Sequence, residues 1–282
     1  IAIPGTSGLT TVTGTVYTGF ETATYTANLP APWSVQARNV RQVIFASAVT
    51  PLSTAYWFDG MNNLGTVAFN DLLDTWRTTS MSHMFSGCSR LIEADMSALD
   101  TREVTNMNGL FANCAKLASV RLANVNANGT PKTGAGVRTG VFDVKNVVDM
   151  ADMFAGAGSI NSIALSAQFS FKGAGIEQRN KWAELDPVST SSPYTGRWVL
   201  STRATDSTAG RYTSTELRDQ YTAAMAGTYV WATTVGTNAE KVINALLIPR
   251  NESLAVDHAS QTYDVKFWRG NRVINPDNPT ST

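Results

Sequence analysis

A short apolar pattern recurs along this chain at a period near 26 residues. Each copy places its residues at positions i, i+3, i+4 and i+7, which is the spacing of one face of a short helix. A unit of this length cannot bury its own apolar face, so neighbouring copies must stack. The pattern therefore predicts a solenoid. The copies, of which the first is degenerate, are Thr54-Trp57-Phe58-Met61, Met81-Met84-Phe85-Cys88, Met107-Leu110-Phe111-Cys114 and Met150-Met153-Phe154-Ala157.

A second pattern follows each copy at constant phase, and a fifth example leads the array. Its alternating apolar end is typical of a short strand with one face turned inward. We therefore expect an α/β solenoid, a short leucine-rich-repeat-like stack of strand–helix units with a β-rich N-terminal segment and a C-terminal cap and hairpin. The strand patterns are Val40-x-x-Val43-x-Phe45, Leu64-x-x-Val67-x-Phe69, Leu91-x-x-Ala94-x-Met96, Leu117-x-x-Val120-x-Leu122 and Ile160-x-x-Ile163-x-Leu165.

Polar residues mark the expected start of each helix. Each has a side chain that accepts a hydrogen bond from a free backbone N–H, and they are Ser53, Ser80, Asn106 and Asp149. Residues suited to a left-handed cap follow near the other ends, namely Gly60, Gly87, Asn113 and Gly156. The spacing thus predicts a capped helix in every repeat.

The rest of the chain divides around this array. We expect an N-terminal β segment over 1–32, the repeat array over 33–175, its C-terminal cap over 176–236, and a further small part over 237–282. The interval between the last two repeats is 43 residues, which predicts an inserted loop at about 126–141. Within the cap, Thr213 and Glu216 form a capping box that predicts a helix over 217–221. Residues 262–274 read as a hairpin.

Composition excludes some classes of function. Charged residues make up 16% of the chain, its formal net charge is zero, and lysine and arginine are dispersed, so we expect no nucleic-acid partner. No stretch approaches the roughly 20 apolar residues that cross a membrane, so we expect no direct membrane insertion. The chain opens at Ile1 without an initiator methionine, and we expect a mature protein or an excised piece of a larger one.

The repeat resembles that of the bacterial surface-protein leucine-rich-repeat family, often called BspA-like. Residues 100–114 read DTREVTNMNGLFANC, beside a family pattern of approximately D-T-S-x-V-T-N-M-x-x-M-F-x-x-C, and residues 80–88 and 147–154 match it as well. The resemblance covers roughly residues 32–231, and implies a secreted or surface-exposed protein used in adhesion or partner binding. This chain departs from the pattern in having few repeats, Thr54 at the head of the first, Ala157 in place of a cysteine, and the inserted loop.

Catalytic and metal-binding constellations are not visible in the sequence. Of the two histidines, His83 is expected at an outward position equivalent to Asn108 and Asp152, where it is solvated. Cys88 and Cys114 occupy one position in successive repeats, and we expect two small buried residues. Stacked helices lie about 8–10 Å apart, which disfavours a disulfide between them. We expect no enzyme, no cofactor and no metal site.

The outward strand positions form the best candidate contact surface, because stacking aligns them in two rows. The expected rows are Thr66, Glu93, Ser119 and Ser162, and Ala68, Asp95, Arg121 and Ala164. Asp95 and Arg121 should be neighbours across about 4.8 Å and pair with each other. Partner-binding candidates are Glu93, Asp95, Ser119 and Arg121 on the strands, with Lys132 and Arg138 on the inserted loop.

Two functions remain open from the sequence. The first is a non-enzymatic, surface-exposed binding or adhesion module that recognises a protein or glycan partner. The second is a structural subunit of a virion, a surface layer or a filament, because a charge-poor, threonine-rich surface suits lateral packing. Both place the protein outside the cell, on a cell surface or on a virion surface, and both allow self-assembly.

Overall fold

The computed structural model describes residues 19–45, 47–69, 71–123, 142–173 and 176–234 with their side chains, and three further strands by their backbone. By its internal contacts the chain divides into two units, Ile1–Thr234 and Val235–Thr282. Of the N-terminal β segment expected over 1–32, residues 1–18 lie outside the described residues, and so does the inserted loop expected at about 126–141.

The described part of the first unit is built mostly from strands, with one short α-helix. In chain order its elements are η1 (Pro32–Gln36), β1 (Gln42–Ile44), β2 (Thr66–Ala68), β3 (Glu93–Asp95), β4 (Ser119–Leu122), β5 (Ser162–Leu165), η2 (Arg179–Lys181), β6 (Tyr194–Leu200), η3 (Ser201–Arg203), β7 (Arg211–Tyr212), α1 (Ser214–Gln220), η4 (Ala223–Met225) and β8 (Gly227–Thr233).

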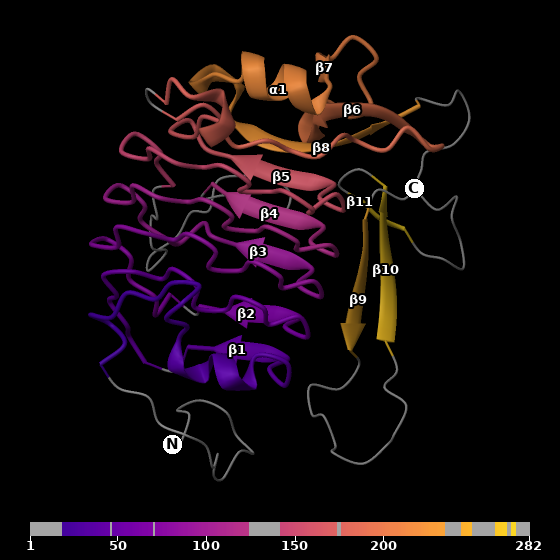
Figure 1. The fold of residues 1–282 in the computed structure, drawn as a ribbon. Helices are drawn as coiled ribbons and strands as arrows, with labels where there is room; N and C mark the ends of the chain where they lie inside the picture. The colour runs from indigo at the N-terminus through magenta and orange to yellow at the C-terminus, as the bar shows by residue number, and fades with distance from the viewer. Residues whose placement is uncertain are drawn as a thin grey trace. The chain divides into compact units, whose positions relative to one another are not determined.

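Five of these strands, β1 to β5, coincide with the five strand patterns of the sequence, and Figure 1 shows them one above another. β1 pairs in parallel with β2, and β3, β4 and β5 pair in parallel in one unbroken register. β8 then runs antiparallel to β5 and is followed by β6 and β7, which gives a mixed six-stranded sheet of order β3-β4-β5-β8-β6-β7. The strand predictions are confirmed.

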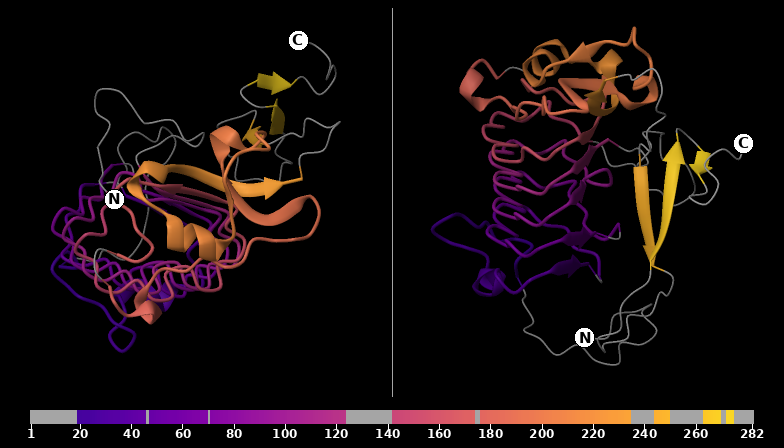
Figure 2. Two further views of the ribbon diagram at one scale, coloured as in Figure 1. Left: turned by 90° about the horizontal axis from the view of Figure 1, so that it is seen from above. Right: turned by 90° about the vertical axis from the view of Figure 1, so that its right-hand side faces the viewer.

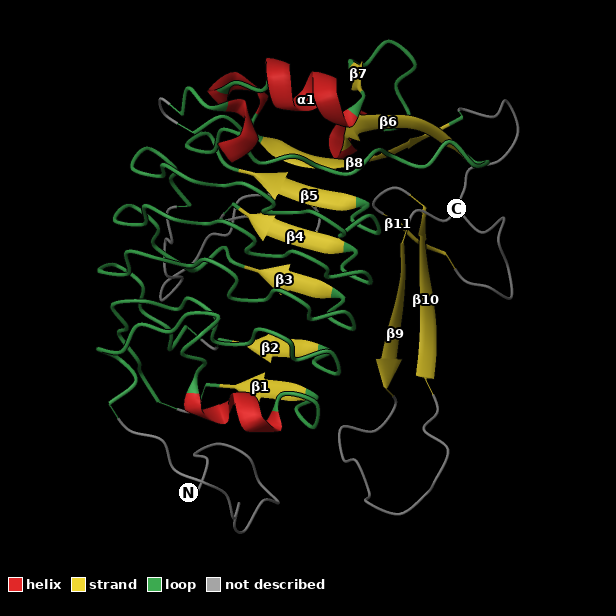
Figure 3. Ribbon diagram, in the orientation of Figure 1, coloured by secondary structure: helices red, strands yellow, loops and turns green. Residues whose placement is uncertain are grey.

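The expected helices of the repeats are absent from the described residues, and that prediction is wrong. The apolar stripes form successive turns instead, drawn as loops in Figure 3. Each stripe has two residues with positive φ, which interrupts a right-handed helix. In the second repeat they are His83 at 53° and Gly87 at 73°. The N–H groups of Met81, His83, Phe85 and Gly87 donate to carbonyls of the following repeat, so they are not available for helical bonds.

The polar residues expected as helix caps instead cap these turns. The side chains of Ser53, Ser80, Asn106 and Asp149 each accept a hydrogen bond from the backbone N–H two residues later, at 2.9–3.3 Å. This is the geometry of serine and Asx turns. The predicted left-handed positions are confirmed, because Gly60, Gly87, Asn113 and Gly156 all have positive φ.

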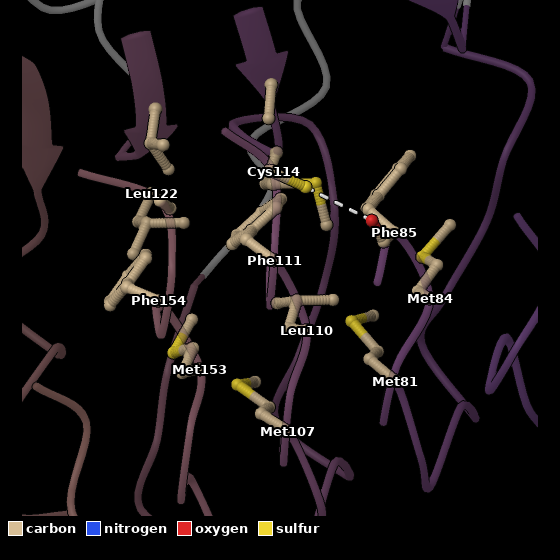
Figure 4. Packing of buried hydrophobic residues seen from close by; sticks show 14 of the residues in the cluster. Met81, Met84, Phe85, Met107, Leu110, Phe111, Cys114, Leu122, Met153 and Phe154 are labelled. Carbon is tan, nitrogen blue, oxygen red and sulfur yellow. Dashed lines mark hydrogen bonds between the residues drawn. The ribbon is translucent and has the colours of Figure 1, made fainter. Parts of the chain in front are cut away.

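Apolar side chains fill the space between strands and turns, which lie along opposite sides of the first unit (Figure 2). Equivalent phenylalanines of successive repeats lie over one another, and Figure 4 shows Phe85, Phe111 and Phe154 beside the methionines and Cys114. Their ring centroids are 5.3 Å apart for Phe58 and Phe85, 5.7 Å for Phe85 and Phe111, and 5.9 Å for Phe111 and Phe154. Each repeat therefore buries the apolar face of its neighbour.

Both ends of this core are covered by non-repeat residues. At the β1 end, Phe20, Tyr25 and Trp33 make edge-on ring contacts, and the indole N–H of Trp33 donates to the carbonyl of Trp57. At the other end, α1 begins with the predicted capping box, in which Thr213 and Glu216 satisfy each other's backbone N–H groups. Its Leu217 is fully buried. β8 lies within the cap predicted over 176–236.

The second unit is described as three strands, β9 (Asn244–Pro249), β10 (Tyr263–Arg269) and β11 (Arg272–Ile274). They form an antiparallel sheet in the order β11-β10-β9. The pairing of β10 with β11 matches the hairpin expected over residues 262–274.

Candidate functional site

The outward positions of β3, β4 and β5 form the two predicted rows, but Thr66 and Ala68 do not continue them, because β2 pairs with β1 in a separate sheet. Glu93, Ser119 and Ser162 are direct partners in the register, and so are Asp95, Arg121 and Ala164. Ala164 is not accessible on this face, because it is only 2% exposed. We call Glu93, Asp95, Ser119, Arg121 and Ser162 the strand face.

Arg121 is the centre of the strand face. Its Nη2 donates to Oδ2 of Asp95 at 2.7 Å, and its Nη1 forms an ion pair with the carboxylate of Glu93. The predicted Asp95–Arg121 pair is therefore confirmed, and Glu93 is an additional partner. Parallel pairing places β3 and β4 side by side, which brings the two acids to either side of one guanidinium.

The electrostatics of the strand face follow from this cluster. Burial raises the pKa of Asp95, but hydrogen bonds from Arg121 and Ser97 outweigh it and hold the pKa at about 2. Burial lowers the pKa of Arg121, and the two carboxylates raise it above its usual value. Two carboxylates and one guanidinium leave one net negative charge. The side chain of Glu93 is 49% exposed against 17% for Arg121, so the accessible charge is a carboxylate.

The remaining two candidates, Lys132 and Arg138, lie outside the described residues, and their place in the surface stays a prediction. The structure thus brings together the four strand candidates.

His83 is less solvated than the sequence suggested. Its ring stacks on Tyr56 with centroids 4.8 Å apart, and the residue is half-buried. The equivalent position in the next repeat is Gly109, not Asn108, because both His83 and Gly109 have positive φ two residues after Met81 and Met107. A Cβ on Gly109 would lie 2.5 Å from the His83 ring, so the glycine provides the space for it.

Two surface features were missed by sequence reasoning. Trp76 is 56% exposed in the turn after β2, and no motif distinguished it from its neighbours. A hollow of about 900 Å³ lies beside the start of α1, where Trp182 is overlain by Lys172 at 5.0 Å. Burial raises the pKa of Asp186 in this hollow. The available signal is the aromatic residues of 176–198, namely Trp182, Tyr194 and Trp198, but the sequence predicts no more than a cap there.

The described residues hold no group of three or more histidine, cysteine, aspartate or glutamate side chains placed to bind a metal ion. Over the same residues, no helix has the length and apolar character to cross a membrane. Cys88 and Cys114 are free and fully buried.

The described residues of the first unit thus form a mostly-strand structure with a mixed six-stranded sheet and a polar strand face. Residues 53–170 match the model of a family described as Mycoplasma protein of unknown function, DUF285. The matched segment begins at Ser53 of the first repeat and extends past β5, so it contains the stacked phenylalanines and the whole strand face. Comparison with curated proteins gives no match, and neither does comparison with solved structures.

Proposed function

We propose that residues 33–175 form a short solenoid of the BspA-like type, and that the chain is a non-enzymatic, surface-exposed binding or adhesion module. Its partner is a protein or a glycan, and the strand face provides the contact. The observation that carries this proposal is the Glu93–Arg121–Asp95 cluster, held on two hydrogen-bonded strands above a fully buried apolar core.

Rigidity of the strand face favours binding. The inward neighbours of its residues on β3, β4 and β5 are the buried Ala94, Val120 and Ile163, which fix the strands against the core. The Arg121 side chain is already ordered by two carboxylates, so it loses little conformational freedom when a partner binds. Preorganised arginine is also a frequent energetic centre of interfaces.

The chemistry of the strand face limits the partner. Glu93 is an exposed acceptor, Ser119 and Ser162 offer hydroxyls, and the cluster carries one net negative charge. Such a surface suits the hydroxyl groups of a neutral glycan or the lysine and arginine side chains of a protein. An anionic glycan is disfavoured by charge.

Binding to a glycan array and to a panel of extracellular-matrix proteins tests the proposal. The informative variants are Arg121→Ala and the double variant Glu93→Gln, Asp95→Asn, and we expect each to weaken binding at least tenfold. Arg102→Ala is the matched control, because Arg102 also pairs with an aspartate, Asp100, but in a turn outside the strand face. Equal binding by the parent and both strand-face variants would exclude this face. If Arg102→Ala were the only variant to lose binding, the binding site would lie near Trp76, which occupies the same turn position one repeat earlier.

A structural subunit is the second candidate, and one observation favours it. Exposed apolar side chains lie in the segments at the β1 end of the first unit, where Leu29, Val35 and Ile44 are 62%, 80% and 46% exposed. End-to-end association of subunits would cover them. Sedimentation over a range of concentrations distinguishes the candidates: assembly that Val35→Glu abolishes supports the structural role, and a monomer at all concentrations excludes it.

A further inference from the structure

The two cysteines have a relationship that the proposed function does not use. Cys88 and Cys114 occupy the same position in consecutive repeats, and both thiols are free and fully buried. The fourth repeat has Ala157 at this position, which is 2% exposed. A small apolar residue therefore satisfies the packing, and the thiols add chemistry that packing does not require.

The backbones of these two repeats lie as close together as adjacent β-strands. The N–H of Gly87 donates to the carbonyl of Ala112 at 2.7 Å, and the N–H of Phe85 donates to the carbonyl of Leu110 at 3.0 Å. Hydrogen bonds of this kind bring adjacent backbones to about 4.8 Å. The 8–10 Å expected for stacked helices does not apply, because these segments are turns. A backbone separation near 5 Å lies within the roughly 4.4–6.8 Å that disulfides span between Cα atoms.

The two cysteines also meet at one carbonyl group. The oxygen of Phe85 accepts the N–H of Cys88 at 3.0 Å and the Sγ–H of Cys114 at 3.1 Å, the contact dashed in Figure 4. The sulfur of Cys114 therefore lies directly beside the backbone of Cys88. The thiol of Cys88 donates to the carbonyl of Phe58, 3.1 Å away in the preceding repeat.

We propose that Cys88 and Cys114 are a disulfide pair, closed while the chain folds by exchange with a small disulfide such as oxidised glutathione. The thiolate of one cysteine attacks the glutathione disulfide, forming a mixed disulfide and releasing one glutathione thiolate. The thiolate of the other cysteine attacks the protein sulfur of the mixed disulfide, forming the intrachain S–S bond and releasing the second glutathione. The two protein thiols are oxidised, the glutathione disulfide is reduced, and the two thiol protons end on the released glutathiones.

The disulfide forms during folding and not in the folded protein. Burial raises the pKa of Cys114 to about 12 and raises that of Cys88 as well, so the native protein at neutral pH contains almost no thiolate. No surface of either side chain is exposed, so glutathione cannot reach the sulfurs without opening the core. The incompletely folded chain has neither restriction.

The experiment compares the full chain refolded from denaturant with oxidised and reduced glutathione against the chain refolded with a reductant. Free thiols are alkylated after denaturation and counted by mass spectrometry. We expect no alkylation and a monomer in the first sample, and two alkylated cysteines in the second. The bond closes a 26-residue separation, so the thermal midpoint should rise by roughly 5–10 °C and fall again with reductant.

Cys114→Ala is the control, because Ala157 shows that alanine is accommodated at this position. Under oxidising conditions this variant should show no reductant-dependent midpoint shift. Two free thiols, glutathione adducts or bonds between chains in the refolded parent would overturn the proposal. Rapid oxidation of the native, reduced protein would overturn the assignment of closure to folding.

Discussion

Phe85 and Phe111 stack face to face, with ring centroids 5.7 Å apart and ring planes within 10° of parallel. Both are at most 1% exposed. Phe111 lies between Phe85 and Phe154, so its removal leaves a cavity that both neighbouring repeats line. We expect Phe111→Ala to lower the free energy of unfolding by about 3–5 kcal/mol, measured by urea denaturation. Phe111→Leu keeps most of the volume and should cost less than half as much. An alanine variant as stable as the parent would show that the stack contributes little.

The Thr101 hydroxyl joins two repeats inside the core. It donates to the carbonyl of Asp143 at 2.8 Å and accepts the N–H of the same residue at 2.8 Å. Thr101→Val keeps the shape but deprives both backbone groups of this partner, so we expect a loss of about 1–3 kcal/mol in the free energy of unfolding. Thr105→Val is the control, because Thr105 is exposed; its effect should stay within about 0.5 kcal/mol. Equal effects of the two substitutions would contradict this role.

Gly109 combines a left-handed backbone with a close side-chain contact. Its φ is 61°, and a Cβ there would lie 2.5 Å from the His83 ring. Gly60 has a φ of 71° and nothing within 4 Å of its Cβ position. Gly60→Ala should therefore cost only the left-handed penalty of about 1–2 kcal/mol, whereas Gly109→Ala should cost more. Thermal unfolding of the double variant Gly109→Ala, His83→Ala provides the check. Removing the His83 ring should recover the stability that Gly109→Ala loses beyond the left-handed penalty. No recovery would mean that the contact is not responsible.

Asp95 makes the free energy of unfolding depend on pH in the acid range. Its folded pKa of about 2 lies below the roughly 3.9 of an unfolded aspartate. The stabilisation is therefore complete above about pH 4 and is lost as the pH falls from there through about 2. The side chain is 34% exposed, so solvent screening reduces the contribution to the order of 1 kcal/mol.

Denaturation of Asp95→Asn between pH 2 and pH 6 measures this contribution. We expect the variant to be less stable than the parent at pH 6 and to converge with it near pH 2. Asp100→Asn is the comparison, because its partner Arg102 is 54% exposed and the pair should contribute less. A parent–variant difference that does not change with pH would rule out the ion pair as its cause.

Much of the strand face was predictable from the sequence. The alternation from Leu91 to Met96 and from Leu117 to Leu122 fixes which side chains point outward. A constant period then requires that Asp95 and Arg121 become neighbours. Glu93 was not predicted as a second partner, because the register alone does not specify which of two nearby carboxylates a long arginine side chain reaches. Trp76 and the hollow beside Trp182 depend on how non-repeating residues fold against the array, and no local pattern encodes that.

The sequence by itself determined the period, the strands, the register of β3 to β5, the left-handed positions and the capping box at Thr213 and Glu216, because each depends on local backbone preference or on side-chain alternation. It did not determine that β2 pairs with β1 in a separate sheet. Only the tertiary structure decided that the stripes from Met81 and Met107 form turns and not helices. The spacing i, i+3, i+4, i+7 buries one apolar face in either conformation. The choice between turn and helix depends on the hydrogen-bond partners of the backbone. Because each repeat lies at strand spacing from the next, the N–H groups of Phe85 and Gly87 donate to carbonyls of the following repeat. In a helix, the same N–H groups would donate to carbonyls of their own segment.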